Sequence, residues 1–325
     1  TTAGTRQSLV EPIEALLALP PARWLLDGLL PEAGVALMVA PPNVGKSTVA
    51  LDWALRVATG SDWHGRAMQA GGVAYFAGEG RRGIGQRAAA WLASHDATLS
   101  HRLDLVTRTP PLSQPEGQRE LAAIVAEARP RLVVVDTISS LWGGASEDDA
   151  SAVAPFLASL QRMAEAAGCL FLLLHHERKP SAQPQAGNAW AAVRGSGAWV
   201  GSADAALSLS GPPEALQLAT LKQRDGERLP PISLRLVAVA LPNGGSSVVV
   251  VPGAEAPPAA EHEPRAEDAI LAAMRLLGAD GITLPGAMQA GGCAKSTAWR
   301  ALNLLVSNGL ADQFGRRGAI RWRVR

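Results

Sequence analysis

The 325-residue sequence is short of cysteine and of charge, and each shortage excludes a class of protein. Charged residues make up 18% of the chain and the net charge is +1, so any attraction to nucleic acid has to be local rather than global. The two cysteines, Cys169 and Cys293, lie far apart and match no metal-ligand spacing. This usage favours a reduced, cytoplasmic protein.

Long apolar stretches are also missing. No run approaches the roughly 20 apolar residues that span a bilayer, and the first ten residues lack the basic and apolar segments of a secretion signal. We therefore expect no membrane association. The hydrophobic fraction of 47% is nevertheless ample for buried cores, which excludes a chain that is disordered throughout.

Short apolar runs alternate with helical patterns over the first half of the chain. The apolar runs cover residues 35–40, 73–78, 103–107, 132–137 and 169–176. The helical patterns cover residues 47–58, 85–94, 117–128 and 150–167. Strands that are apolar throughout and separated by helices predict a mostly parallel sheet covered on both faces, in a three-layer α/β domain.

The pattern changes after residue 200. Four further apolar runs follow one another without helices, at residues 205–210, 216–223, 232–240 and 246–251. We expect them to extend the same sheet in antiparallel fashion. The sequence thus predicts a first domain over residues 1–252, with an N-terminal segment over 1–32. A linker rich in Ala, Pro and Glu follows at 253–264, and a small module at 265–325.

A possible phosphate-binding loop, APPNVGKST, lies at residues 40–48 between a predicted strand and a predicted helix. The pattern G-x-x-x-x-G-K-[ST] is met by Gly45, Lys46 and Ser47, but Ala40 replaces the first glycine. Backbone N–H groups of such a loop surround phosphates, Lys46 would reach the outer phosphates, and Ser47 would bind Mg²⁺. A chance Gly-Lys-Ser turn is the alternative, but the flanking strand and helix favour an ATP site.

The residues expected to hold ATP are those of the loop and one distant lysine. They are Asn43, Val44, Gly45, Lys46, Ser47, Thr48 and Lys222.

Three residues at strand ends are candidates for the chemistry of such a site. Asp136 follows four apolar residues and could hold Mg²⁺ through water, or could merely cap the next turn. Glu79 lies between two glycines after the second strand, which we expect beside the loop strand, and could activate water or be a solvated loop residue. His176, rather than His175, could sense the γ-phosphate, or either could be a core histidine.

Taken together, these residues resemble those of the plasmid RepA-type hexameric replicative helicases, which are related to the DnaB-type helicases. The resemblance is carried by GKST, by Glu79, and by VVVDT, LLLHHERK and VRGSGA, and extends over roughly residues 20–240. It implies a RecA-like ATPase domain and a hexamer with single-stranded DNA in its channel. It also implies that Glu79 activates water and that His176 contacts phosphate.

The segment LKQRDGE at 221–227 resembles the Lys-x-Arg-x-Gly hairpin of DnaB-type helicases. In that family the lysine and arginine enter the neighbouring subunit's site, which implies that Lys222 and Arg224 act in trans on the transition state. A basic turn without a partner is the alternative. Arg194 is a rival for the same role, or a DNA contact.

Two loops differ in their suitability for DNA. The stretch after Asp136, SSLWGGASEDDAS, is acidic and would repel phosphate in a channel. The polar stretch after the fifth strand carries Arg178, Lys179 and Arg194, with Trp190 able to stack on a base. We expect DNA contact from the second stretch, although a plain loop is the alternative.

The C-terminal module reads as three helices followed by a strand pair, an order that resembles a winged helix-turn-helix. Nine basic and four acidic residues give residues 265–325 a balance of +5. Lys295 and Arg300 lie at the start of the third helix, where bases are read, and Arg316 and Arg317 lie at the tip of the predicted wing. We expect duplex DNA binding here, with protein docking as the alternative.

The function predicted from these features is an ATP-hydrolysing ring that translocates on DNA, namely a RepA-type replicative helicase of a mobile element. Two rival functions stay open at this point. One is a RecA-fold DNA-binding ATPase in recombination or helicase loading, and the other is a DNA-binding regulator that uses nucleotide only as a switch.

Overall fold

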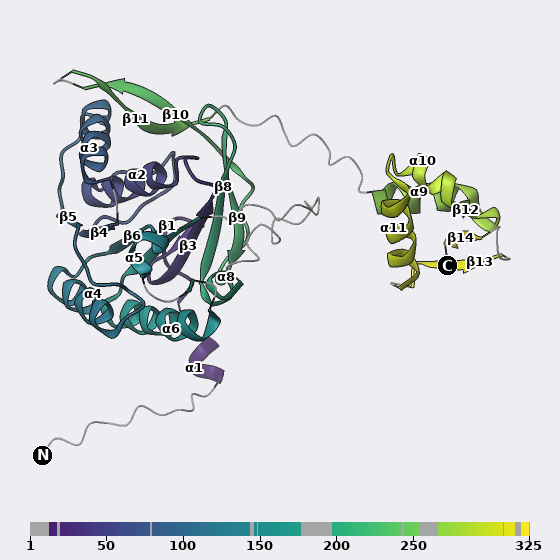
Figure 1. Cartoon of the computed structure of the whole chain (residues 1–325), viewed down its shortest axis with the longest axis horizontal. Helices are drawn as coiled ribbons and strands as arrows, with labels where there is room; N and C mark the ends of the chain where they lie inside the picture. The colour runs from purple at the N-terminus through teal and green to yellow at the C-terminus, as the bar shows by residue number, and fades with distance from the viewer. Residues whose placement is uncertain are drawn as a thin grey trace, which may run out of the picture. The chain divides into compact units, whose positions relative to one another are not determined.

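The computed structural model describes residues 13–17, 20–78, 80–143, 146–147, 149–176, 197–241, 244–253, 266–307, 309–315 and 320–324. The chain divides into two compact units, Thr1–Ala254 and Glu255–Arg325 (Figure 1).

A nine-stranded sheet among the described residues forms the centre of the first unit, in the order β11-β10-β9-β8-β3-β7-β6-β4-β5. Its strands are β3 (Gly34–Ala40), β4 (Val73–Ala77), β5 (Leu103–Val106), β6 (Leu132–Asp136), β7 (Leu170–His176), β8 (Ala205–Ser210), β9 (Leu216–Gln223), β10 (Ile232–Ala240) and β11 (Ser246–Pro252). A small antiparallel ribbon, β1 (Trp24–Leu26) with β2 (Leu30–Pro31), precedes it.

Helices cover both faces of the sheet, as Figure 1 shows. One face carries α2 (Lys46–Thr59) and α3 (Arg81–His95), and the other carries α4 (Pro115–Ala128), α5 (Ile138–Trp142), α6 (Ala150–Ala167) and α8 (Gly197–Ser202). Alternate residues of β3 enter the two cores, with Ala36 and Met38 under α2 and Val35 and Leu37 on the opposite face. The predicted three-layer α/β domain with a mostly parallel sheet is confirmed.

Two expectations about strand order were wrong. The run at 205–210, expected to begin the antiparallel part, is β8, which pairs in parallel with β3 and is antiparallel only to β9. Similarly, β4 does not lie beside β3, because β7 and β6 separate them. Every interior strand of a doubly covered sheet is equally apolar, so the pattern predicts the strands without their order.

The second unit contains α9 (Ala266–Leu277), a short 3-10 turn (Gly278–Asp280), β12 (Ile282–Thr283), α10 (Leu284–Ala290), α11 (Lys295–Ser307), β13 (Ala311–Phe314) and β14 (Arg321–Val324). Its strands form an antiparallel sheet in the order β12-β14-β13. The fully buried Ile270, Met274, Leu302 and Trp322 belong to a core that joins the helices to this sheet. The sequence of three helices followed by a strand pair is the predicted one. The additional strand β12 was not predicted, because a strand of two residues leaves no recognisable pattern in the sequence.

One short helix, α1 (Ile13–Leu17), is described ahead of the first unit's sheet. Within the described part of the chain, no helix combines the length and the apolar character needed to cross a membrane.

Candidate functional site

The loop between β3 and α2 is shaped by two residues with left-handed backbone, Asn43 with φ 63° and Gly45 with φ 110°. A Cβ atom at Gly45 would also lie 3.0 Å from Leu236 Cδ1, so both the conformation and the space favour glycine. An α-helix then begins at Lys46. The N–H groups of Lys46 and Ser47 come before the first hydrogen bonds of the helix, which Thr48 and Val49 donate to the Gly45 carbonyl oxygen, and this makes the end a favourable place for an anion such as phosphate.

Ala40, which replaces the first glycine of the loop pattern, is the last residue of β3. It is fully buried in the core under α2 and pairs in regular parallel register with His176 of β7. Its backbone does not have the positive φ of Asn43 and Gly45. Alanine is therefore compatible with a working loop.

A cavity of ≈ 440 Å³ lies beside the loop. Seven residues predicted to take part in the site line it, namely Asn43, Gly45, Lys46, Ser47, Thr48, Asp136 and His176. The side chain of Val44 packs against the hydrophobic core instead, so its contribution to an anion site would come from its backbone.

Lys46 is the cation at the centre of this cavity wall. Its Nζ donates a hydrogen bond to the His175 carbonyl oxygen at 2.9 Å and lies 3.2 Å from His176 Nδ1. The side chain is buried, and burial lowers the pKa of Lys46 to about 8, against the opposing effect of Asp136. A phosphate would give this ammonium the anionic partner that its surroundings supply only in part.

Asp136 is held by two hydroxyl groups at the end of β6. Ser47 Oγ donates to Asp136 Oδ1 at 2.8 Å, and the Tyr75 hydroxyl donates to Asp136 Oδ2 at 2.6 Å. Burial and the neighbouring Asp136 raise the pKa of Tyr75, so the phenol keeps its proton. The two predicted Mg²⁺ ligands, Ser47 and Asp136, thus lie together, and a hydroxyl with a carboxylate suits a cation that retains several waters.

The two histidines at the end of β7 face different surroundings. His176 lines the cavity, and burial followed by the charge of Lys46 lowers its pKa, so the ring is neutral at pH 7. His175 Nε2 lies 3.2 Å from Glu147 Oε2, and the ring lies against Trp199 with centroids 5.7 Å apart. The structure therefore directs His176, and not His175, towards the loop.

Four predicted site residues of the first unit, Glu79, Arg178, Lys179 and Arg194, lie outside the described residues. The glycines on either side of Glu79 are described: Gly78 N donates to the Asp136 carbonyl oxygen at 2.8 Å, and Gly80 lines the cavity. The strand that precedes Glu79 was expected beside β3, and this expectation was wrong, because β4 pairs with β6 instead. The glycines reach the cavity through that neighbour, which ends in Asp136.

Arg224 lies at the opposite end of the sheet from the cavity, and Lys222 lies on β9 between the two ends. We call the end of β3, β6 and β7 at Ala40, Asp136 and His176 the carboxyl edge, and the end at which β3 begins the amino edge. Ala36 pairs with Ala205, and Ala205 pairs with Gln223, so Arg224, the next residue, lies at the amino edge. Lys222 pairs with Ala206, and Ala206 pairs with Leu37, so Lys222 is level with the middle of β3. Five residues of strand, about 17 Å, separate Val35 from Ala40.

Both basic side chains have partners in their own chain. Lys222 Nζ donates to the carbonyl oxygens of Val200 and Gly201, at 3.2 and 2.7 Å, and Arg224 pairs with Asp204. Burial, followed by the charge of Arg224, lowers the pKa of Lys222. Neither residue lines the cavity of its own chain.

The sequence reasoning missed several groups around the cavity. Tyr75 precedes the end of β4, and Arg87 of α3 lines the cavity with a buried Nε that has no hydrogen-bond partner in the described structure. The sequence feature that could have indicated Arg87 is its place in the helix that follows the second predicted strand. Leu236 and Val248 also line the cavity, because the β10–β11 hairpin folds back over the loop, and no local signal predicts that contact.

The acidic stretch after β6 has local partners in its described part. Glu147 Oε2 accepts from Ser139 Oγ at 3.0 Å, and its carbonyl oxygen accepts from Trp199 Nε1 at 3.0 Å. Asp149 caps α6 by accepting from the Ser151 N–H at 2.9 Å. These acids join the stretch to α5, α6 and α8.

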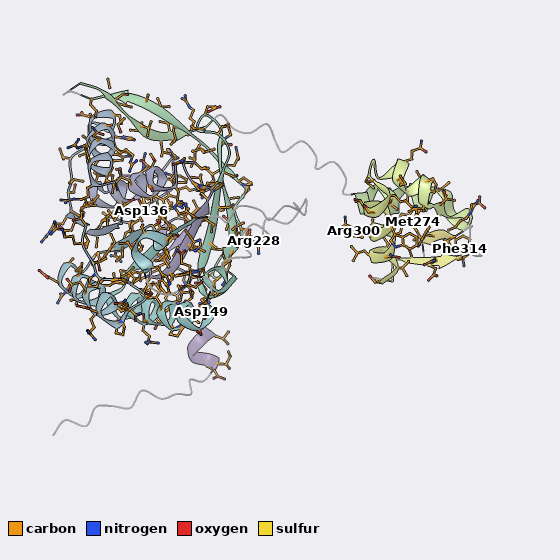
Figure 2. All side chains as sticks on the ribbon, viewed as in Figure 1. Asp136, Asp149, Arg228, Met274, Arg300 and Phe314 are labelled. Atoms are coloured by element: carbon orange, nitrogen blue, oxygen red, sulfur yellow. The ribbon has the colours of Figure 1, made fainter. Side chains whose placement is uncertain are left out.

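In the second unit, Lys295 and Arg300 are exposed on α11, and Arg316 and Arg317 lie outside the described residues. Figure 2 shows Arg300 at the periphery of this unit, whereas Asp136 lies in the interior of the first. Trp299, 40% exposed, and Leu304 share the helix with Arg300.

Comparison with known proteins gives one family and a distant structural likeness. A family model described as an AAA domain matches residues 5–182, more than half of the chain. The chain is also similar to the solved structure of a DnaB-like replicative helicase, described with its interactions with primase, at a TM-score of 0.49 and 14% identity. That similarity covers 72% of this chain and 66% of the helicase chain, which is less than two thirds of its length. No curated protein is significantly similar in sequence.

Proposed function

The chain belongs to the AAA domain family, and from this premise we propose that it is an ATP- and Mg²⁺-dependent ring ATPase that translocates on DNA. The more specific proposal is a RepA-type replicative helicase of a mobile element. The observation that carries the ATPase proposal is the group formed by Lys46, Ser47, Asp136 and His176 around the cavity at the start of α2.

Each residue of this group has a proposed role that its position supports. Lys46 binds the outer phosphates, and His176, neutral and 3.2 Å from Lys46, contacts the γ-phosphate. Ser47 and Asp136 hold Mg²⁺ with the help of water, and that cation would offset the negative charge of the phosphates. Tyr75 fixes the orientation of the Asp136 carboxylate.

Two further residues complete the proposed chemistry. Glu79 is the general base that orients and deprotonates the attacking water, and the two flanking glycines bring its segment to Asp136 and the cavity. Arg87 supplies a second positive charge from the same chain, since it lines the cavity and its Nε is buried without a hydrogen-bond partner among the described residues.

A ring is the assembly that the two edges of the sheet favour. The cavity lies at the carboxyl edge, whereas Arg224 lies at the amino edge, and neither Arg224 nor Lys222 lines the cavity of its own chain. If one copy presents its amino edge to the carboxyl edge of the next, the contact is head-to-tail, and such contacts form a ring when the rotation between copies closes. We propose a hexamer in which Arg224 acts as an arginine finger in trans.

DNA is the proposed partner of both units. Arg178, Lys179 and Arg194 would contact single-stranded DNA in the ring channel, in keeping with their polar and basic segment. The exposed Lys295 and Arg300 of α11, with Arg316 and Arg317, would bind duplex DNA.

A second candidate function has one specific observation in its favour. Trp299 and Leu304 are exposed on the same helix as Arg300, and exposed aromatic and aliphatic side chains are typical of protein contacts. This favours a DNA-binding ATPase that loads another protein without unwinding DNA itself.

The experiment combines an ATPase assay with strand displacement on a forked duplex. Wild-type protein should hydrolyse ATP faster with single-stranded DNA and displace the strand, and Lys46→Ala should abolish both activities because the main cation at the phosphates is lost. Arg102→Ala, which removes a surface arginine paired with Asp104, is the matched control and should match wild type. Full turnover by Lys46→Ala would refute the site, and ATPase without displacement would favour the loading function.

A further inference from the structure

We propose that Asp204 is the positioning residue that holds Arg224 for the neighbouring subunit's site, and that it does so from the beginning of β3. This inference rests on the proposed trans role of Arg224. It adds a residue that neither the sequence pattern nor the family match assigns.

Asp204 connects β3 with the segment that carries Arg224. Its Oδ2 accepts a hydrogen bond from the Val35 N–H at 2.9 Å, and its Oδ1 pairs with Arg224 Nη1. The backbones are joined too: Asp204 N donates to the Val35 carbonyl oxygen at 2.8 Å, and Arg224 N donates to the Asp204 carbonyl oxygen at 3.0 Å. One residue therefore fixes Arg224 against β3 through both backbone and side chain.

A third element orients the carboxylate. Gln161 of α6 places its Nε2 3.3 Å from Asp204 Oδ2 and donates to the Ser202 carbonyl oxygen at 3.0 Å. The Asp204 side chain is 13% exposed, so these contacts leave it little freedom to turn. An arginine bound to a carboxylate with a fixed direction has its planar guanidinium fixed as well.

The chain leaves room for this carboxylate by using glycine at the start of β3. Gly34 has φ +123°, and a Cβ atom there would lie 2.5 Å from Asp204 Oδ2. A side chain at position 34 would thus displace the carboxylate. Gly34 offers a way to disturb Asp204 without removing its charge.

The exposure of Arg224 indicates what the arrangement leaves available. Its side chain is 50% exposed, and the pair with Asp204 engages Nη1 of a group that has five N–H donors. The arrangement therefore leaves N–H donors of the guanidinium available to another molecule.

β3 joins this contact to the chain's own phosphate loop. The strand runs from Gly34, beside Asp204, to Ala40, where the loop begins. Its residues are buried and paired on both sides, with β7 and β8, so it acts as a stiff connection. The strand that leads into the chain's own phosphate loop therefore also fixes the orientation of Arg224.

The test uses Asp204→Asn in the full-length assembled protein, because the amide keeps the size of the side chain and removes its charge. We expect kcat for ATP to fall at least tenfold and KM to stay within about twofold, since the chain's own loop is intact. A double variant, Asp204→Asn with Arg224→Ala, should be no slower than Arg224→Ala alone, because both changes remove one function. Additive losses in the double variant would mean a merely structural role and would overturn the proposal.

Mixed assemblies distinguish this proposal from the one on which it rests. Asp204→Asn mixed with Lys46→Ala should regain activity, because some contacts then join an intact loop to a correctly held Arg224. Asp204→Asn mixed with Arg224→Ala should regain none. If Arg224→Ala and Lys46→Ala also fail to complement in proven mixed assemblies, the trans role itself is wrong; if only the Asp204→Asn pair fails, the positioning role is wrong.

Gly34→Ala is the second variant, in case Asp204→Asn does not fold. It should lower kcat and be complemented by Lys46→Ala in the same way, with retained ATP binding as the check that the loop is intact. Arg102→Ala serves again as the control with unchanged kcat. Wild-type kcat in a folded Asp204→Asn or Gly34→Ala, or a faster rate from a released Arg224, would overturn the proposal.

Discussion

The two edges of the central sheet differ in how many residues of the candidate site each one contributes. At the carboxyl edge, Lys46, Asp136 and His176 contact one another or their neighbours within one chain, and the β10–β11 hairpin covers the loop. At the amino edge, Arg224 is held by Asp204 and half exposed, and it does not line the cavity beside the loop. The carboxyl edge therefore contains most of the residues of the candidate site, whereas the amino edge presents one ordered side chain, Arg224.

This difference accounts for the proposed assembly better than either edge alone. A buried cluster with perturbed pKa values, such as that of Lys46 and His176, is typical of a functional site. The half-exposed Arg224 at the far end of the same sheet has N–H donors available to another molecule. A head-to-tail contact between copies would bring the two edges together.

Removing the Arg224 side chain from the amino edge should have the largest effect on the ATPase rate while leaving the phosphate loop of each chain intact. Arg224→Ala is expected to lower the ATPase rate of the assembly by about 10³–10⁵, the range of arginine fingers, while ATP binding persists. A nucleotide-binding titration beside a turnover assay measures both quantities. If Arg224→Ala loses both ATP binding and ATP turnover, then Arg224 acts on the structure of its own chain and not on a neighbouring subunit.

At the carboxyl edge, Glu79→Gln should separate binding from chemistry. Loss of a general base costs about 10²–10⁴ in rate, and the amide leaves the charge of Lys46 in place. The variant should therefore bind ATP and accumulate an ATP-bound assembly, detectable by size and by retained nucleotide. Normal hydrolysis by this variant would show that another residue activates the water.

The burial of Lys46 at the carboxyl edge has a consequence for the free energy of unfolding. The pKa of Lys46 is about 8 in the fold, against an ordinary value of 10.5 for lysine, so the unfolded chain binds more protons between these pH values. Stability of the nucleotide-free protein should accordingly rise with pH across this window, by about 2–3 kcal/mol from this group. Denaturant unfolding at pH 8 and pH 10 measures it.

Lys46→Met is the matched variant for that measurement. It removes the titrating group and keeps a long apolar side chain, so its stability should change less between the two pH values. Equal changes in wild type and Lys46→Met would contradict the burial of an uncompensated ammonium at the loop.

The second unit provides the smallest expected effect on ATP turnover, because it belongs to neither edge. Replacing Arg316 and Arg317 by Ala should leave basal ATPase unchanged and weaken binding to every duplex sequence. Two lost phosphate contacts should flatten the dependence of log affinity on log salt by about two. A chain ending near residue 255 that binds duplex as tightly as the full protein would show that the module docks proteins.

Much of the carboxyl edge could be predicted from local sequence. The loop, Asp136 and His176 each stand at the end of an apolar run, and parallel strands bring such ends to one edge. The doubt over Ala40 also has a local answer, because that residue is still in β3 and needs no special backbone.

The rest depends on long-range pairing that no local pattern encodes. The position of Arg224 follows from the register of β8 with both β3 and β9, and the parallel pairing of β8 was not predicted. Asp204 and Tyr75 acquire their significance from partners 20 to 169 residues away, and Arg87 acquires it from the cavity that it lines. An isolated charged or polar residue in the sequence carries no sign of such partners.

The central claim, that the active site is shared between copies, is tested most directly by mixing Lys46→Ala with Arg224→Ala. Each protein alone should be inactive. An equal mixture should regain about a quarter of wild-type ATPase activity, since a random head-to-tail contact joins an intact loop to an intact Arg224 in about one case in four. Absence of any recovery, in assemblies shown by differential tagging to contain both chains, would contradict the account.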